Sequence, residues 1–296
     1  MTPKVWLNGK LFDKGAAALD VYDHGTLYGD GVFEGIRAYN GALFEIDPHL
    51  RRLYDSAKAI RLAIPQTPSE MKRAIERTVE AAGASDCYIR VVVTRGIGHL
   101  GISPLKCGTV STFIIVDTIS MYPPETYRNG ITLITASVVR NHPNALSARI
   151  KSLNYLNNIL AKIEANDAGA DEAIMLNCHG YVAECSADNL FLVRDGVVRT
   201  PSEDQCLLAG ITRGVILRLC RENGIPVREC VVERHDLYVA DECFLTGTGA
   251  EVVPVRRIDG RDVGDGRVGP LTLAMALAQR VHPPAIRHPE ERVIVG

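Results

Sequence analysis

One lysine of this chain lies in a segment where its side-chain amine could be reactive. The chain has 8 lysines among its 33 basic residues, and Lys151 stands in the segment Ala148–Tyr155, between a strand region and a helix start. An amine at a helix N-terminus meets an unfavourable positive dipole and some desolvation, which together favour its neutral form. Schiff-base formation needs a neutral amine. The alternative interpretation of this segment is a solvated lysine in a surface loop.

Two small-residue turns and one arginine are suited to hold a phosphate group. Gly210, Ile211 and Thr212 stand at a helix start, where free backbone N–H groups and a hydroxyl can bind an anion. The turn Thr246–Ala250 follows a strand, and its glycines permit a second group of N–H donors. Arg52, one step off the apolar stripe of its helix, could donate two parallel hydrogen bonds. Common Gly-Thr turns and a solvated helix-face arginine are the alternatives.

Turn and capping signals place the elements that carry these residues. Asn8-Gly9 and Asn40-Gly41 predict hairpins, the second with a strand running on to Ile46. Asp47-Pro48 predicts a helix whose N-cap is Asp47, and Thr67–Glu70 predicts a capping box that begins the next helix. Further helices are expected over 154–168, 212–223 and 270–281, and strands over 87–94, 109–117, 131–139, 172–176, 189–194, 227–232 and 243–245.

The order of these elements predicts an α+β fold. Strands and helices mix without a regular βαβ alternation, which argues against a doubly wound sheet. The helix over 154–168 has one apolar face, formed by Leu156, Ile159, Leu160 and Ile163. A turn-rich linker over 120–130 separates an N-terminal domain, 1–119, from a C-terminal domain, 131–296.

Composition excludes several classes of function. The 296 residues are 46% hydrophobic with a net charge of −2, and they contain no basic block, so we expect no nucleic-acid partner. No apolar run reaches the length of a membrane helix, and we expect no membrane partner. The 8 cysteines form no C-x-x-C pair and no zinc-finger spacing with histidine, so we expect no metal and a cytoplasmic location with free thiols.

Six ordered motifs together resemble a known family. They are Tyr28–Arg37, Arg52–Lys58, Lys151–Leu156, Asn189–Phe191, Gly210–Arg213 and Gly247–Glu251. In this order they are similar to the fold-type IV pyridoxal-phosphate enzymes, and most of all to the branched-chain-amino-acid aminotransferases, from about Lys4 to Pro270. The resemblance implies a D-amino-acid aminotransferase-like α+β fold, with a small N-terminal α/β domain and a larger C-terminal domain that binds pyridoxal 5'-phosphate.

The same resemblance implies roles for the cofactor residues. Lys151 is the catalytic residue that forms the Schiff base and shuttles a proton between the substrate Cα and the cofactor. Glu184 pairs with the pyridine nitrogen and keeps it protonated, so that the ring can accept electrons. Tyr155 donates a hydrogen bond to the phenolic oxygen. The phosphate is held by Arg52, Ile211, Thr212, Gly247 and Thr248.

Substrate residues follow from the resemblance and from strand geometry. Tyr88 and Arg90, two apart on a strand, share one face and match a Tyr-x-Arg pair that handles substrate carboxylates. Phe33 and Tyr28 supply apolar walls, and the Thr248-Gly249 turn takes the α-carboxylate. A Tyr and an Arg on an ordinary sheet surface are the alternative. The family is at least homodimeric, and Tyr28 is expected to serve the neighbouring pocket.

The expected reaction is transfer of the amino group of L-leucine, L-isoleucine or L-valine to 2-oxoglutarate, giving branched 2-oxo acids and L-glutamate. D-amino-acid aminotransferase and aminodeoxychorismate lyase of the same fold are the alternatives, and a non-catalytic binding protein is a remote one. Cys185 and Gly249 stand where the family usually has glycine and alanine, which bears on the substrate range.

Overall fold

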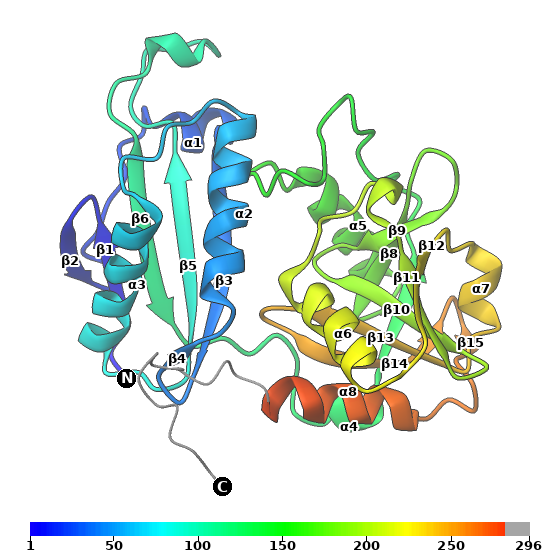
Figure 1. Cartoon of the computed structure of the whole chain (residues 1–296). Helices are drawn as coiled ribbons and strands as arrows, with labels where there is room; N and C mark the ends of the chain where they lie inside the picture. Colours follow the sequence, from blue (N-terminus) through cyan, green and yellow to red (C-terminus); the bar gives the residue numbers. More distant parts are fainter. Residues whose placement is uncertain (282–296) are drawn as a thin grey trace, which may run out of the picture.

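The computed structural model describes residues 1–281 and contains two separate β-sheets, each with helices packed on it (Figure 1). A six-stranded sheet has the order β2-β1-β6-β5-β3-β4, and a nine-stranded sheet has the order β12-β11-β10-β13-β14-β7-β8-β9, with β15 beside β14. The predicted α+β class is confirmed. Within residues 1–281, no helix combines the length and the apolar character that crossing a membrane requires.

The first sheet is antiparallel throughout, because hairpins and returning connections link its strands. Its elements are β1 (Lys4–Leu7), β2 (Lys10–Asp13), α1 (His24–Tyr28), β3 (Gly31–Tyr39), β4 (Ala42–Leu43), α2 (Ile46–Ala59), α3 (Pro68–Ala82), β5 (Cys87–Thr94), a 3-10 turn (Pro104–Lys106) and β6 (Ser111–Asp117). Both predicted Asn-Gly hairpins are confirmed, and all four turn residues have the positive φ that this turn needs. The Thr67 capping box is also confirmed.

Helix α2 begins earlier than its sequence signal indicated. The expected N-cap, Asp47, lies inside the first turn, and the actual N-cap is Glu45, whose φ of 48° is left-handed. Strand β4 therefore ends at Leu43, not at Ile46. Pro48 is the third residue of the helix, where a backbone N–H would have no partner within the helix. The helix therefore tolerates a proline there.

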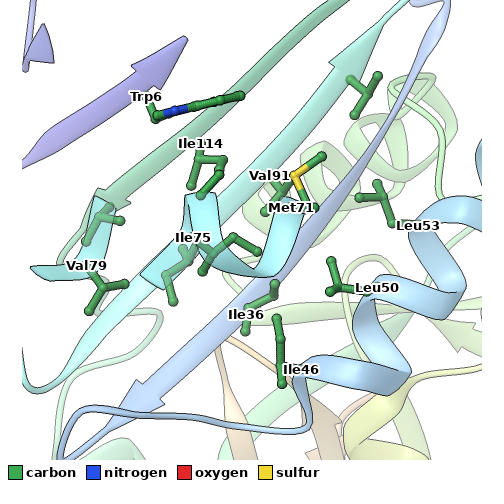
Figure 2. Close-up of a cluster of buried hydrophobic side chains, with 14 of the residues drawn as sticks. Trp6, Ile36, Ile46, Leu50, Leu53, Met71, Ile75, Val79, Val91 and Ile114 are labelled. Carbon is green, nitrogen blue, oxygen red and sulfur yellow. The ribbon is translucent and has the colours of Figure 1, made fainter. Parts of the chain in front are cut away.

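Helices α2 and α3 cover one face of the first sheet and bury its core. Figure 2 shows Leu50 and Leu53 from α2 and Met71 and Ile75 from α3 pointing at the strands. The strand partners drawn there include Ile36, Val91 and Ile114. This packing fixes the orientation of α2, and with it the side of α2 that faces the second sheet.

The second sheet mixes parallel and antiparallel pairs. Its elements are α4 (Thr126–Asn129), β7 (Ile131–Thr135), α5 (Leu156–Asp167), β8 (Glu172–Leu176), β9 (Val182–Cys185), β10 (Asn189–Arg194), β11 (Val197–Pro201), a 3-10 turn (Glu203–Gln205), α6 (Ile211–Glu222), β12 (Val227–Cys230), α7 (Arg234–Tyr238), β13 (Glu242–Gly247), β14 (Glu251–Ile258), β15 (Arg261–Asp262) and α8 (Pro270–Val281). Strand β7 pairs in parallel with β8 and β14, and β11 pairs in parallel with β12.

Both faces of the second sheet are buried at its centre. On β10, Leu190 and Leu192 belong to one apolar cluster, while Phe191 and Val193 belong to another under α6 and α8. Phe191 stacks on Phe244 of β13 with ring centroids 5.0 Å apart. Burial on both faces explains why β10 is a continuous apolar run instead of an alternating one.

The apolar face of α5 points away from the sheet. Its side chains are largely exposed, at 67% for Leu156, 51% for Ile159, 44% for Leu160 and 47% for Ile163. The face that packs on the sheet is instead small and partly polar, with Asn158, Ala161 and Ala165 buried. Exposed apolar side chains at helical spacing are typical of an interaction surface.

Candidate active site

The segment that carries Lys151 joins the two sheets. Phe33 N donates to Lys151 O at 3.0 Å, and Leu153 N donates to Gly31 O at 3.0 Å, so the segment pairs with β3. Lys151 N donates to Ser56 Oγ on α2 at 3.1 Å. Helix α5 begins only at Leu156, with Tyr155 as its N-cap. The expected placement of Lys151 at a helix N-terminus is therefore wrong, since the helix dipole acts within the first turn.

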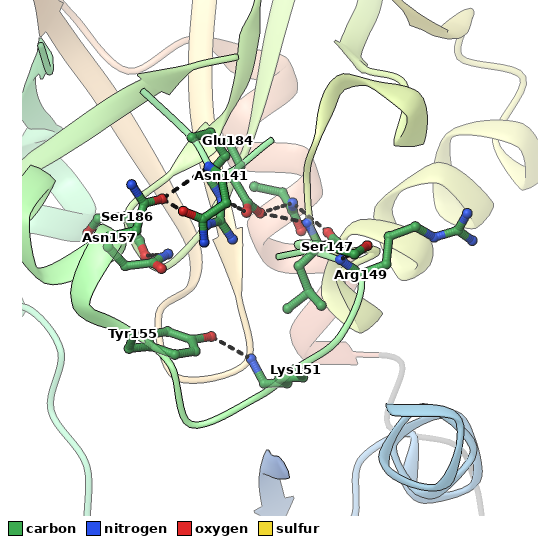
Figure 3. Close-up of polar contacts among 12 residues, drawn as sticks. Asn141, Ser147, Arg149, Lys151, Tyr155, Asn157, Glu184 and Ser186 are labelled. Carbon is green, nitrogen blue, oxygen red and sulfur yellow. Dashed lines mark hydrogen bonds and ion pairs between the residues drawn. The ribbon is translucent and has the colours of Figure 1, made fainter. Parts of the chain in front are cut away.

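The Lys151 amine lies among aromatic groups. Its Nζ donates to Tyr155 Oη at 3.2 Å, the contact drawn in Figure 3. The same nitrogen is 4.6 Å from the centroid of the Phe33 ring. Phe33 and Tyr155 meet edge to face at 5.1 Å. These contacts hold the amine between β3 and the start of α5, and they bring Lys151 and Tyr155 together as the sequence predicted.

Glu184 is a buried carboxylate on β9 that lines a small cavity together with Lys151 and Tyr155. Arg140 Nε donates to its Oε1 at 2.9 Å, and Leu208 N donates to its Oε2 at 3.0 Å. Figure 3 shows Glu184 with dashed contacts at its carboxylate. Burial raises the pKa of Glu184, while Arg140 and the Leu208 N–H oppose that shift. The Arg140 guanidinium is itself held by Asn157 Oδ1 at 3.0 Å.

Arg52 reaches from α2 toward the second sheet and is fixed by a buried acid. Its Nε and Nη2 donate to the two carboxylate oxygens of Glu34 at 2.7 and 2.9 Å, and its Nη1 donates to Ala209 O at 2.8 Å. Burial raises the pKa of Glu34, but Arg52 and His49 overcome this and hold it at about 2. His49 Nδ1 lies 2.7 Å from Glu34 Oε2. The pair presents a pre-oriented guanidinium beside the start of α6.

The start of α6 has the expected free backbone donors. Gly210 is its N-cap and makes no side-chain cap hydrogen bond. A Cβ at Gly210 would lie 2.0 Å from Asn189 Oδ1, so a side chain there would have to displace the Asn189 amide. Ile211 lines a groove together with Arg52 and Ser56, and the Thr212 side chain is buried beside it. The helix start and Arg52 therefore lie together although they come from two distant parts of the chain, and both carry donors of the kind that can hold an anion.

A cavity of about 420 Å³ lies on the other side of Lys151. Its walls include Phe33, Tyr88 and Arg90 from the first sheet and the Thr248–Ala250 turn from the second. The Arg90 guanidinium lies 4.6 Å from the Phe33 ring centroid and 5.4 Å from that of Tyr88. A Cβ at Gly35 would come within 2.2 Å of Tyr88 Oη, so this glycine makes room for the tyrosine.

Five predicted site residues do not line this cavity. Glu184 lines the smaller cavity, Ile211 and Thr212 lie at the start of α6, and Tyr28 and Gly247 lie elsewhere. Tyr28 stands on α1, where its hydroxyl accepts from Gly101 N at 2.8 Å and its ring meets His24 at 4.9 Å. Tyr28 does not line the cavity of its own chain. Gly247 lies behind the Thr248–Ala250 turn, where a Cβ would meet Asp188 Oδ1 at 1.9 Å. Gly249 and Thr248 line the cavity directly.

Sequence reasoning missed the residues that support the predicted ones. Glu34 shares the core face of β3 with Val32 and Ile36, and a carboxylate on an apolar face signals a buried partner. Arg140 and Asp188 follow apolar stretches without such a signal, because their partners are distant in the sequence. Within the described part of the chain, no cluster of His, Cys, Asp and Glu could hold a metal ion, and all 8 cysteines are free.

Both the sequence and the structure of this chain are similar to those of known proteins. Residues 31–258 match the family Amino-transferase class IV. A putative branched-chain-amino-acid aminotransferase of Methanocaldococcus jannaschii is 51% identical over 269 residues, covering 91% of this chain and 92% of that protein. The crystal structure of the Escherichia coli branched-chain amino acid aminotransferase is 36% identical, with a TM-score of 0.91 over 94% of this chain and 93% of that one.

A structure with a bound group extends the comparison. The T.th. branched-chain amino acid aminotransferase complexed with N-(5'-phosphopyridoxyl)-L-glutamate is 39% identical to this chain. Its TM-score is 0.88, over 94% of this chain and 93% of that one. That complex holds a phosphopyridoxyl group joined to an amino acid.

Proposed function

This chain belongs to the class IV aminotransferases, as a fold-type IV enzyme of the branched-chain group that uses pyridoxal phosphate, and on that premise we propose its reaction. It transfers the amino group of L-leucine, L-isoleucine or L-valine to 2-oxoglutarate, giving a branched 2-oxo acid and L-glutamate. The observation that carries this proposal is the 420 Å³ cavity, which joins apolar walls to Arg90 beside Lys151. The glutamate adduct of the T.th. relative supports the second substrate.

The residues around Lys151 suit pyridoxal phosphate on chemical grounds. Lys151 supplies an amine for its aldehyde, Tyr155 a hydroxyl for its phenolic oxygen, and Glu184 a carboxylate for its ring nitrogen. We assign its phosphate to Arg52, Ile211, Thr212, Gly247 and Thr248. This is supported by Arg52, which lines one cavity with Thr248 and a groove with Ile211. When bound, this cofactor supplies an electron-accepting ring that weakens the substrate Cα–H bond.

In this reaction Lys151 moves the proton at the substrate Cα. Its Nζ accepts that proton and later returns it, while the Tyr155 hydroxyl at 3.2 Å keeps the nitrogen in place. Glu184 holds a proton on the ring nitrogen, and Arg140 keeps the carboxylate oriented for that task. The aromatic rings of Phe33 and Tyr155 limit the access of water to the amine.

On the substrate side, Phe33 and Tyr88 provide the wall for a branched side chain, and Arg90 binds the distal carboxylate of glutamate. The N–H groups of the Thr248-Gly249 turn bind the α-carboxylate. Tyr28 serves the pocket of a neighbouring copy, since its ring lies outside the cavity of its own chain.

A substrate panel tests the proposed reaction. Purified protein with bound cofactor is assayed with L-leucine, D-alanine and aminodeoxychorismate, using 2-oxoglutarate as the acceptor for the two amino acids. We expect turnover of L-leucine alone. Turnover of only the D-isomer indicates a D-amino-acid aminotransferase, and release of the lyase product indicates an aminodeoxychorismate lyase. Absence of visible cofactor absorption indicates a binding protein.

The substitution Arg90→Met tests the dual-substrate cavity. Methionine keeps an apolar stem against Phe33 but loses the charge, so we expect KM for 2-oxoglutarate to rise by about tenfold or more. KM for L-leucine should change by less than about threefold, because its side chain needs no cation. Steady-state kinetics with each substrate varied in turn measures the split. Arg77→Met, on the exposed face of α3, is the matched control. Equal effects on both substrates contradict the assignment.

The substitution Glu34→Gln tests how Arg52 is positioned. Loss of the charge removes a bidentate partner that holds the guanidinium, so we expect the Kd of pyridoxal phosphate to rise by about tenfold. The stabilising pair is present above the ordinary glutamate pKa and is lost as pH falls toward about 2. Cofactor titration followed by absorbance measures the Kd. Glu76→Gln on α3 is the control, and an unchanged Kd in the Glu34 variant contradicts the role.

We propose a homodimer or a larger homo-oligomer, supported by the exposed apolar face of α5 and by the exposed Leu100, Ile102 and Leu105. Changing Ile163 to Glu places a charge in that face, and we expect dissociation toward the monomer. Light scattering after gel filtration measures the mass. Ala81→Glu, at an exposed position of α3, is the control. A monomeric wild-type protein contradicts the proposal.

Two further assignments are proposals of the same kind. The domain division at 1–119, 120–130 and 131–296 is supported by the two sheets with separate apolar cores, and residues 282–296 of that division lie outside the described residues. A cytoplasmic location is supported by the 8 free cysteines, most of which are buried or half-buried as thiols.

A further inference from the structure

Asp188 is a buried carboxylate that the reaction described above does not use. It lies in the short turn between β9 and β10, is 5% exposed, and lines the 420 Å³ cavity. Its Oδ2 makes no hydrogen bond to any of residues 1–281. Hydrogen bonds to the turn itself hold the residue in place, since Cys185 N donates to Asp188 O at 2.8 Å and Ser186 N donates to Ala173 O at 3.0 Å. A buried polar atom without a partner costs stability and calls for an explanation.

The carboxyl group of Asp188 packs directly on the turn that faces the substrate. A Cβ at Gly247 would lie 1.9 Å from Asp188 Oδ1, so the absence of a side chain at 247 creates the space that Asp188 fills. Residues Thr248, Gly249 and Ala250 follow at once and line the same cavity. The position of that turn therefore depends on the Asp188 side chain.

Two acidic residues and two lysines face Asp188. Glu172 on β8 and Glu184 on β9 face it, whereas the cations that face it are Lys162 on α5 and Lys151. Lys162 Nζ lies 3.5 Å from Glu172 Oε2, and Lys151 Nζ donates to the Tyr155 hydroxyl, so each cation is engaged by another group. The Cys185 thiol and the Tyr122 hydroxyl also interact electrostatically with Asp188. Burial, followed by Glu172, raises the pKa of Asp188 to about 7.

We propose that Asp188 is a positioning and specificity residue, which sets the Thr248–Ala250 turn through Gly247 and whose charge controls how tightly the cavity binds a carboxylate. The inference rests on the proposed function, in which that turn takes the substrate α-carboxylate. With a neutral Asp188 the turn's N–H groups act on the substrate alone. An ionised Asp188 repels the incoming carboxylate across a few ångströms of low-dielectric protein. Carboxylate binding is therefore expected to weaken as pH rises through about 7.

The test compares the holoenzyme with its Asp188→Asn variant, which keeps the shape and removes the charge. The probe is 4-methylvalerate, which has the carbon skeleton of leucine but no amino group to react. We expect its Kd in the wild type to rise by about fivefold or more between about pH 6 and about pH 8.5. In the variant, most of this pH-dependent rise in Kd should be absent. Asp195→Asn, at the exposed tip of the β10–β11 hairpin, is the matched control and should follow the wild type.

A second measurement reports whether Asp188 is neutral in the folded protein. When folding raises the pKa of a carboxyl group, the folded protein becomes less stable as pH rises from the ordinary pKa of that group to its pKa in the folded state. For Asp188 this range runs from about 4 to about 7. The melting temperature of the variant minus that of the wild type should therefore grow over this range and level off above it. This comparison reads the charge of Asp188 without using activity.

The inference is overturned if the variant and the wild type show the same dependence of probe Kd on pH. It is also overturned if their difference in melting temperature does not change with pH. Failure of the proposed function has a different signature, namely a wild-type enzyme that does not turn over L-leucine. The binding and melting curves of Asp188→Asn are independent of that assay.

Discussion

Replacing Lys151 with alanine is expected to reduce kcat by about 10⁴-fold or more, because in the proposed reaction the same amine holds the cofactor and moves the proton at the substrate Cα. Within residues 1–281, Lys151 is the lysine whose amine lies between Phe33 and Tyr155 and lines both cavities. The two polar side chains that share the smaller cavity with Lys151 are poor substitutes as a base, since Tyr155 Oη is a phenol and Glu184 is engaged by Arg140. Stopped-flow and steady-state assays with L-leucine measure the loss.

A matched control separates this effect from a general effect of losing a lysine. Lys10→Ala removes an exposed lysine of the first hairpin, and it should leave kcat within about twofold of the wild type. The Lys151 variant should still bind the cofactor through Arg52 and the start of α6, and added methylamine should restore part of the rate. Turnover near the wild-type value in Lys151→Ala contradicts the assignment of this residue.

Replacing Glu184 with glutamine is expected to lower kcat by about 10²- to 10³-fold. Glutamine keeps the size of the side chain, but its single amide oxygen can accept from only one of Arg140 and the Leu208 N–H. It also lacks the charge that, in the proposed reaction, holds a proton on the ring nitrogen. The electron-accepting strength of the ring should fall accordingly, with a smaller effect on cofactor affinity. The rate of Cα–H cleavage, measured with deuterated leucine, isolates the affected step.

Glu242→Gln provides the control for loss of a buried carboxylate. Glu242 on β13 accepts from Thr272 N and Thr272 Oγ1 at 2.8 and 2.7 Å at the start of α8, away from both cavities. That variant should lose stability without a comparable change in kcat. A Glu184→Gln enzyme with kcat within about threefold of the wild type contradicts the role of the carboxylate.

Local signals in the sequence predicted the elements best where a turn or a cap is determined by a few adjacent residues. The Asn8-Gly9 and Asn40-Gly41 hairpins and the Thr67 capping box are confirmed for this reason. Strands β9 and β14 were missed, and β7 ends at Thr135 instead of continuing to Val139. Those boundaries depend on pairing with strands distant in the sequence, which no local pattern encodes.

The helix α5 shows the limit of periodicity as a guide to burial. Its apolar face was evident from the spacing of Leu156, Ile159, Leu160 and Ile163, but that face is exposed in the single chain. The sheet takes the alanine side because close packing on β8 leaves room only for small side chains. Periodicity identifies an apolar face and does not identify the partner that covers it.

The folded chain brings predicted site residues from distant segments together. Lys151, Tyr155 and Glu184 line one cavity, and Arg52 lies beside the start of α6, although they come from four distant segments. The mistaken step was the physical reason given for Lys151, since the helix begins after Tyr155. Arg140 and Asp188 could not be predicted, because each acts through a contact made only in the folded chain. Glu34 was missed although its place on the apolar face of β3 is a signal for a buried partner.

The central claim is that one amine, that of Lys151, carries the cofactor. Reduction of the holoenzyme with borohydride fixes the cofactor to the nitrogen that holds it, and peptide mass mapping then locates the added mass. We predict that the mass lies on the peptide containing Lys151 and that it is absent from the Lys151→Ala protein. Attachment to any other lysine, such as Lys162 or Lys58, contradicts the account.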